Sequence, residues 1–173
     1  ASHPKVVAIG EIGLDYHWDV EPREVQKKWF IRQMELAREL GLPIAVHSRD
    51  AAKDTFDLIA EYGKELSGVI HCYSYSPEMA AEYVKMGYHI GLGGVVTFKN
   101  AKKAKETAGK IPLEWIVLET DCPYMAPVPF RGKRNCSAYI DYVADEIGRI
   151  RGISKEEVIA VTERNAKRLF TIS

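Results

Sequence analysis

The sequence predicts an α/β protein of the (β/α)8-barrel type, of which this chain supplies five strand–helix units. Short apolar runs without alternating polar residues indicate parallel strands that are buried on both faces of a sheet. Amphipathic segments with a helical period of about 3.6 residues separate these runs. The spacing of the repeats is close to the roughly 30 residues per unit of a barrel whose eight units occupy about 250 residues. An open, doubly wound sheet is the alternative architecture.

Each expected strand is a short run rich in valine, isoleucine and leucine. Pro43 precedes the second run, at a position where a missing backbone N–H is tolerated. The fifth run is the most apolar in the chain. The strands are expected at residues 6–9, 44–46, 69–70, 88–92 and 115–118.

The first expected helix spans residues 22–40. Pro22 suits its first turn, and Gly41 suits the position just after its last turn. At 100° per residue, the apolar face of this helix is expected to comprise Trp29, Phe30, Met34, Ala37 and Leu40.

The remaining helices follow the later strands. Asp50 is the expected N-cap of a helix at residues 51–62. Further helices are expected at residues 76–86 and 100–108. Two more close the chain, and the last of them begins with a capping box formed by Ser154 and Glu157.

The charge of the chain is balanced overall but not along its length. Basic and acidic residues both number 24, so the formal net charge is zero. Residues 1–98 carry ten basic against fourteen acidic residues (net −4), and residues 99–173 carry fourteen against ten (net +4). We therefore expect the second half to hold a polyanion and the first half to hold cations.

The cysteines and the hydropathy of the chain indicate where it works. Cys72, Cys122 and Cys136 cannot all pair, and free thiols predict a reducing, cytoplasmic location. No run approaches the roughly 18 apolar residues of a membrane span, so no membrane partner is expected. The chain opens with no signal sequence, and we expect one domain over residues 1–173 that lacks the first three units of the barrel.

Four residues with metal-binding side chains follow predicted strands. They are Glu11, His47, His71 and Asp121, which are 36, 24 and 50 residues apart. Because the carboxyl ends of parallel strands meet at one rim, these side chains are expected to converge. Two imidazoles and two carboxylates suit zinc, manganese, magnesium or non-haem iron. A hydrogen-bonded role at the rim is the alternative for any one of them.

A two-metal site is one form that this cluster can take. If Glu11 bridges two ions about 3.5–4 Å apart, the arrangement is suited to phosphodiester hydrolysis. Glu119 is expected on the same side of its strand as Asp121, although it could equally pair with a lysine or arginine. Tyr16 and His17 either line the rim or belong to an exposed loop.

A basic loop follows Asp121. Its residues Arg131, Lys133, Arg134 and Asn135 surround a glycine, which lets backbone and side chains approach phosphate oxygens. A solvated loop without a ligand is the alternative.

Several motifs together resemble one known family. They are Gly10-Glu11-Ile12-Gly13-Leu14-Asp15-Tyr16, His47-Ser48-Arg49-Asp50-Ala51, His71-Cys72-Tyr73-Ser74, Glu119-Thr120-Asp121-Cys122-Pro123-Tyr124 and Arg131-Gly132-Lys133-Arg134-Asn135. In this order they resemble the TatD family of metal-dependent deoxyribonucleases, whose fold is an amidohydrolase-like TIM barrel. The resemblance covers essentially the whole chain.

The resemblance implies a role for each matching residue. Glu11 would bridge two divalent cations, His47 and His71 would hold one of them, and Asp121 would hold the other and help to activate water. Substrate contacts would come from Tyr16, Arg49, Arg131, Lys133 and Asn135. The family's first strand ends in His-x-His, which this sequence lacks, so its five strands would correspond to the fourth to eighth strands of the family.

The sequence therefore predicts a hydrolase that cleaves phosphodiester bonds of DNA with one or two divalent cations (zinc, manganese or magnesium). Catalysis would depend on Asp121 and Glu11. A missing N-terminal segment would complete the barrel. One alternative is an amidase or lactonase of the amidohydrolase type, although no lysine is visible at a strand end to bridge its metals. Another is a non-catalytic interaction module.

Overall fold

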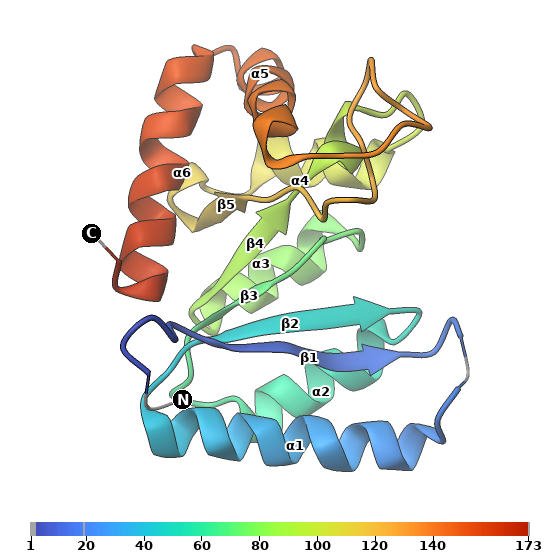
Figure 1. Cartoon of the computed structure of the whole chain (residues 1–173), viewed down its shortest axis with the longest axis vertical. Helices are drawn as coiled ribbons and strands as arrows, with labels where there is room; N and C mark the ends of the chain where they lie inside the picture. The colour runs from blue at the N-terminus through green and yellow to red at the C-terminus, as the bar shows by residue number, and fades with distance from the viewer. Residues whose placement is uncertain (1–2, 19, 173) are drawn as a thin grey trace.

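One parallel sheet contains all five strands found among the described residues, in the order β1-β2-β3-β4-β5. The computed structural model describes residues 3–18 and 20–172. Figure 1 shows the strands fanning out side by side, each paired with the next along the chain. This sequential order is that of a barrel wall, and it lacks the reversal of a doubly wound sheet. The strands are β1 (Ile9–Asp15), β2 (Ile44–Arg49), β3 (Gly68–Ile70), β4 (Tyr88–Leu92) and β5 (Ile116–Leu118).

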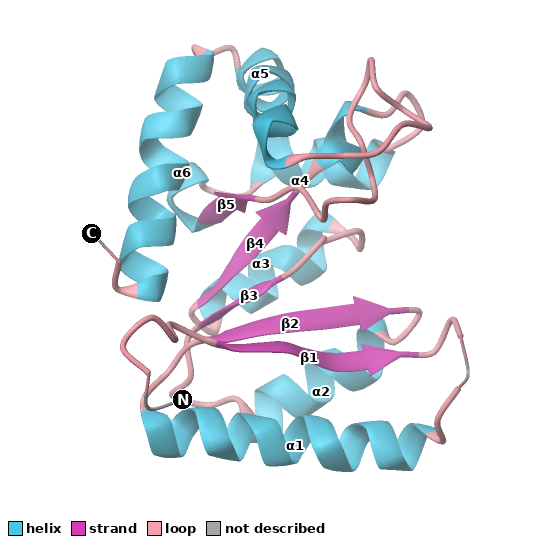
Figure 2. Ribbon diagram, viewed as in Figure 1, coloured by secondary structure: helices cyan, strands magenta, loops and turns pink. Residues whose placement is uncertain are grey.

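Helices connect the strands, as Figure 2 shows, and the alternation that the sequence predicts is confirmed. Within the described residues, no helix is long and apolar enough to cross a membrane. The helices are α1 (Arg23–Leu40), α2 (Ala52–Tyr62), α3 (Pro77–Lys85), α4 (Lys102–Lys110), α5 (Ile140–Arg151) and α6 (Lys155–Phe170).

The two faces of the sheet have different roles. One face is covered by helices and contributes to the main core, through Ile44, Val46, Ile70, Ile90 and Ile116. Side chains alternate between the faces of a strand, so the next residues along each strand point to the other face. There a smaller core joins Val69 and Val117 to Leu169, near the end of α6, with Ala45, Ala166 and Phe170 packed against it. We call this second surface the inner face.

The inner face positions the polar residues of interest. His47 stands two residues after Ala45, His71 two residues after Val69, and Glu119 two residues after Val117. Strand alternation therefore brings apolar residues to the beginning of the inner face and polar residues to its carboxyl end.

The boundaries of β1 differ from the prediction. The strand was expected at residues 6–9, but it begins at Ile9 and continues to Asp15. Its pairing with β2 shifts between Ile9 and Ile12 and then runs in register to Asp15 opposite Arg49. Gly13 permits this pairing, because a Cβ atom there would collide with the backbone carbonyl of His47. Glu11 therefore lies within the irregular part of β1 and not beyond the end of the strand.

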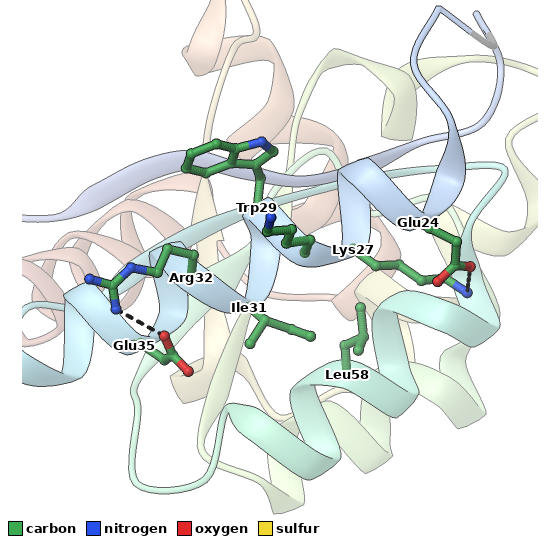
Figure 3. A pocket seen from close by; sticks show the side chains of 8 residues that line it. Glu24, Lys27, Trp29, Ile31, Arg32, Glu35 and Leu58 are labelled. Carbon is green, nitrogen blue, oxygen red and sulfur yellow. Dashed lines mark hydrogen bonds and ion pairs between the residues drawn. The ribbon is translucent and has the colours of Figure 1, made fainter.

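The apolar face of α1 is narrower than expected. Phe30, Met34 and Ala37 are buried as predicted. The prediction is wrong for Trp29 and Leu40, which are 58% and 42% exposed. Trp29 lines a groove along α1 that Leu58 of α2 borders (Figure 3). The reason is that α1 packs mainly on β1, an edge strand, so part of the helix has no neighbour within the described chain.

The helix caps agree with the prediction at two of three positions. The hydroxyls of Ser76 and Ser154 accept hydrogen bonds from the backbone N–H groups of Met79 and Glu157. Asp50 is not a cap, because its backbone adopts a left-handed conformation (φ 53°) and its carboxylate contacts His17 instead.

Candidate functional site

The structure brings Glu11, His47, His71 and Asp121 together at the carboxyl end of the sheet. Nδ1 of His47 lies 2.7 Å from Oε1 of Glu11. Nε2 of His71 lies 3.9 Å from the same Glu11 oxygen and 3.7 Å from Oδ1 of Asp121. The side chains come from β1, from β2 and from the segments after β3 and β5. Their shared rim follows from the parallel sheet, in which all strand ends point the same way.

A further carboxylate backs each imidazole. Oδ2 of Asp15 lies 3.0 Å from Nε2 of His47. Oε2 of Glu119 lies 2.7 Å from Nδ1 of His71, and its Oε1 accepts the backbone N–H of Cys72 at 2.7 Å. Such carboxylate–imidazole pairs fix the orientation of the ring and leave its other nitrogen facing the centre of the cluster.

Sequence reasoning found one of these two carboxylates. Glu119 was expected on this side of the strand, and its partner is His71 rather than a lysine or arginine. Asp15 was not assigned a role. Its signal was present in the spacing, because Asp15 stands four residues after Glu11, and even spacings place residues on one face of a strand.

The charges of the cluster are mutually compensating. The hydrogen bond with His47 lowers the pKa of Glu11 despite its burial, and the same contact, with a smaller contribution from Asp15, raises the pKa of His47. Burial alone would lower the pKa of His71, but the hydrogen bond to Glu119 and the nearby carboxylates raise it to about 9. Protons on the imidazoles thus balance the negative charge of the carboxylates. A bound cation would displace these protons and balance that charge in their place.

The nitrogen and oxygen donors of the cluster are of the kind that bind a divalent cation, but one pair of them lies closer together than two ligands of the same ion do. Two ligands on one zinc ion are about 3.4 Å apart, given bonds of about 2.1 Å and tetrahedral angles. The contacts of His71 with Glu11 and Asp121 are close to that value. The 2.7 Å contact of His47 with Glu11 is a hydrogen bond, so these two groups must separate for both to bind. Accordingly, no three such side chains among residues 3–18 and 20–172 form a ready-made metal site.

Two of the predicted substrate contacts, Tyr16 and Arg49, lie at the ends of β1 and β2. The hydroxyl of Tyr16 donates a hydrogen bond to Asp54 of α2, and the guanidinium of Arg23 lies 4.3 Å from the centre of the Tyr16 ring. The polar group of Tyr16 is therefore occupied. Arg49 is exposed, with its guanidinium 5.4 Å from the centre of the Trp18 ring.

The basic loop carries the other predicted contacts. Arg131 and Lys133 are exposed, and the guanidinium of Arg131 lies 3.8 Å from the centre of the Phe98 ring. Asn135 is buried, and its amide donates to the backbone carbonyls of Thr120 and Tyr124 at 2.6 Å each. Asn135 thus ties the basic loop to the segment that carries Asp121. Contact of these residues with a substrate stays a prediction.

The three cysteines are free in the structure, as the sequence predicts. Cys122 and Cys136 are exposed, and Cys72 is partly buried beside His71. Burial and the nearby carboxylates raise the pKa of the Cys72 thiol to about 12, so it stays protonated at neutral pH.

Comparison with known proteins identifies the family to which this sequence is related. Residues 1–171 match the family described as TatD related DNase. The chain is 49% identical over 174 residues to an uncharacterized metal-dependent hydrolase, YabD, of Bacillus subtilis, with 100% of this chain and 68% of that protein covered. It is 35% identical over 179 residues to a protein of Escherichia fergusonii named 3'-5' ssDNA/RNA exonuclease TatD, with 100% and 69% covered.

A solved structure supports the same relationship. The crystal structure of YjjV, a TatD homologue from Escherichia coli, superimposes with a TM-score of 0.91 and 31% identity. The match covers 98% of this chain and 66% of that one. The chain thus spans about two thirds of the length of the relatives it matches. From the matched residues and the shared fold, the chain belongs to the TatD family of metal-dependent hydrolases.

Proposed function

We propose that the protein hydrolyses phosphodiester bonds of DNA with one or two divalent cations. The observation that carries this proposal is the cluster of Glu11, His47, His71 and Asp121, in which separate carboxylates back both imidazoles. The exposed basic loop supports a polyanionic substrate, since Asn135 anchors it beside Asp121. The name of the E. fergusonii relative points to the same class of substrate.

The residues divide the work between metal and substrate. Glu11, His47 and His71 would hold one cation, and Glu11 and Asp121 would hold a second. When bound, such ions acidify a water molecule and stabilise negative charge on the leaving oxygen. The carboxylate of Asp121 would also accept a proton from the attacking water. Arg131 and Lys133 would neutralise phosphate oxygens of the bound strand.

Cleavage of an end-labelled single-stranded oligonucleotide tests this function. When the segment that would complete the barrel is supplied, we expect cleavage with manganese, magnesium or zinc and none with a chelator. The 173-residue chain alone should cleave little. Asp121→Asn should reduce the rate at least about 100-fold, as loss of a group that positions and deprotonates water does. Glu114→Gln is the matched control, because Glu114 is an exposed acid just before β5. Cleavage that survives chelation, or that Asp121→Asn leaves unchanged, would contradict the proposal. No cleavage with any of the three metals would favour a non-catalytic module.

We further propose that another polypeptide segment completes the barrel and that the protein works in the cytoplasm. Strands β1 and β5 are the two edges of the sheet, and each edge offers backbone N–H and C=O groups to a partner strand. Light scattering on the purified 173-residue chain tests the first point. We expect the chain to self-associate, and we expect a segment carrying three more strand–helix units to prevent this. A stable monomer would argue against an unpaired strand edge.

A further inference from the structure

An exposed tryptophan stands beside the candidate site and has no assigned role. Trp18 follows β1 and is 66% exposed. Large aromatic rings are usually at least partly buried, and a ring this exposed near a functional cluster indicates a contact surface.

The backbone of Trp18 is tied to the cluster through one carboxylate. Oδ1 of Asp15 accepts the N–H of His17 at 2.9 Å and the N–H of Trp18 at 3.4 Å. The other oxygen of Asp15 contacts Nε2 of His47 at 3.0 Å. A single side chain thus sets the position of the turn and the orientation of a candidate metal ligand, so the tryptophan and the cluster are held at a fixed separation.

The ring of Trp18 also has two neighbours that orient it. The ring of His17 meets it edge-on, with centres 4.9 Å apart and an interplanar angle of 87°. His17 is itself held by the carboxylate of Asp50, 3.1 Å from its Nδ1. The guanidinium of Arg49 lies over the Trp18 ring, 5.4 Å from its centre. The ring therefore has a defined position while most of its surface still faces solvent.

We propose that Trp18 is a stacking surface for an unpaired nucleobase of the strand that occupies the site, with Arg49 as the adjoining cation. This inference deepens the proposed function and rests on it. Every nucleobase has an aromatic face, so stacking on tryptophan is strong and tolerates any sequence. A base within a duplex has both faces covered by its neighbours, so this surface selects single-stranded substrate. The guanidinium of Arg49 can neutralise an adjoining phosphate or stack on a neighbouring base.

Binding measurements can isolate stacking from phosphate contacts. The probe is a fluorescein-labelled ten-nucleotide oligothymidine, and its partner is an oligomer of equal length made of abasic sites, which keeps the phosphates and lacks the bases. Both are titrated with the 173-residue chain in the presence of a chelator, and anisotropy reports binding. The variants are Trp18→Ala, Trp18→Phe and Trp29→Ala. Trp29 is the matched control, since it is also exposed but lines the groove along α1 (Figure 3).

We expect Trp18→Ala to weaken binding of oligothymidine about 5- to 150-fold, the range typical of the loss of one base–aromatic stack. It should leave binding of the abasic oligomer and the salt dependence unchanged, because it removes no phosphate contact. Trp18→Phe should recover most of the affinity, and Trp29→Ala should bind both oligomers as the wild type does. Tryptophan emission should fall on binding of oligothymidine in the wild type and much less in Trp18→Phe.

Three results would overturn the inference. They are wild-type affinity for oligothymidine in Trp18→Ala, an equal loss for both oligomers, and a wild-type protein that binds the two oligomers equally well or not at all. The proposed function fails separately. Base-dependent binding without metal-dependent cleavage would support the stacking surface and reject the nuclease activity. Metal-dependent cleavage whose KM is the same in Trp18→Ala as in the wild type would support the nuclease activity and reject the stacking surface.

Discussion

Replacing Glu119 by glutamine should weaken metal binding without removing any of the proposed metal ligands. The Glu119 carboxylate is mostly buried (16% exposed) and accepts from both His71 and the backbone N–H of Cys72. Glutamine has one accepting oxygen, so it can satisfy one of these donors and not both. If its amide nitrogen faces Nδ1 of His71, the ring proton must move to Nε2, the atom that faces Glu11 and Asp121. That nitrogen could then no longer bind a cation.

The expected size of the effect follows from these contacts. Loss of a carboxylate behind a metal-binding imidazole typically lowers metal affinity 10- to 100-fold, which is about 1.4–2.7 kcal/mol. Isothermal titration of the metal-free protein with zinc measures it directly. Glu114→Gln serves as the control for the same chemical change at an exposed position before β5, and it should bind zinc as the wild type does. Circular dichroism should confirm that both variants fold.

The refuting result for Glu119 is specific. A dissociation constant within twofold of the wild type in Glu119→Gln would show that the orientation of His71 does not matter for metal binding. An equal loss in Glu114→Gln would show that the effect comes from overall charge and not from the contact with His71.

The other predictions concern the ligands, the basic loop and a buried histidine. His47→Ala should lower bound metal more than Asp121→Asn does, because the ion that Glu11, His47 and His71 would hold has three protein ligands and the other would have only two. Zinc or manganese titration showing the reverse order would refute the assignment. Lys133→Ala should flatten the slope of log K for DNA against log salt by about 0.7–0.9, since one phosphate contact is lost, and an unchanged slope would indicate a solvated loop. Burial, with a smaller contribution from Arg168, lowers the pKa of His89 to about 4, and neither ring nitrogen has a hydrogen-bond partner among the described residues. His89 is then neutral when folded, so the stability it contributes is present above its unfolded pKa of about 6.5 and is lost as pH falls towards 4, by at most about 3 kcal/mol. Urea unfolding at several pH values should show a shallower acid loss in His89→Phe, and identical pH profiles would contradict this.

Much of the fold could be predicted because periodicity reports burial directly. The buried residues of α1 follow from local spacing, and the caps at Ser76 and Ser154 follow from local hydrogen bonds. The structure confirms both predictions. Trp29 shows the limit of that reasoning. Helical spacing places it near the apolar face, but whether a face is covered depends on neighbours that the pattern does not identify.

The site shows the same division between local and long-range information. His47, His71 and Asp121 could be placed at one rim because parallel strand ends converge. The pairing of Asp15 with His47 joins residues 32 apart. Local spacing can place Asp15 on the same face as Glu11, but which side chain it meets depends on the shifted register of β1 against β2. The observed bounds of β1 differ from the expected ones because its pairing with β2 is irregular around Glu11, and this too depends on contacts between distant residues.

The central claim is that Glu11, His47, His71 and Asp121 bind catalytic divalent cations, and crystals grown with zinc test it most directly. We expect an anomalous peak at the zinc edge with the donor atoms of Glu11, His47 and His71 about 2.0–2.2 Å away, and the Glu11–His47 hydrogen bond broken to admit the ion. A second, weaker peak should lie beside Asp121. A map with no peak at this cluster, and with Glu11 and His47 still 2.7 Å apart, would contradict the account.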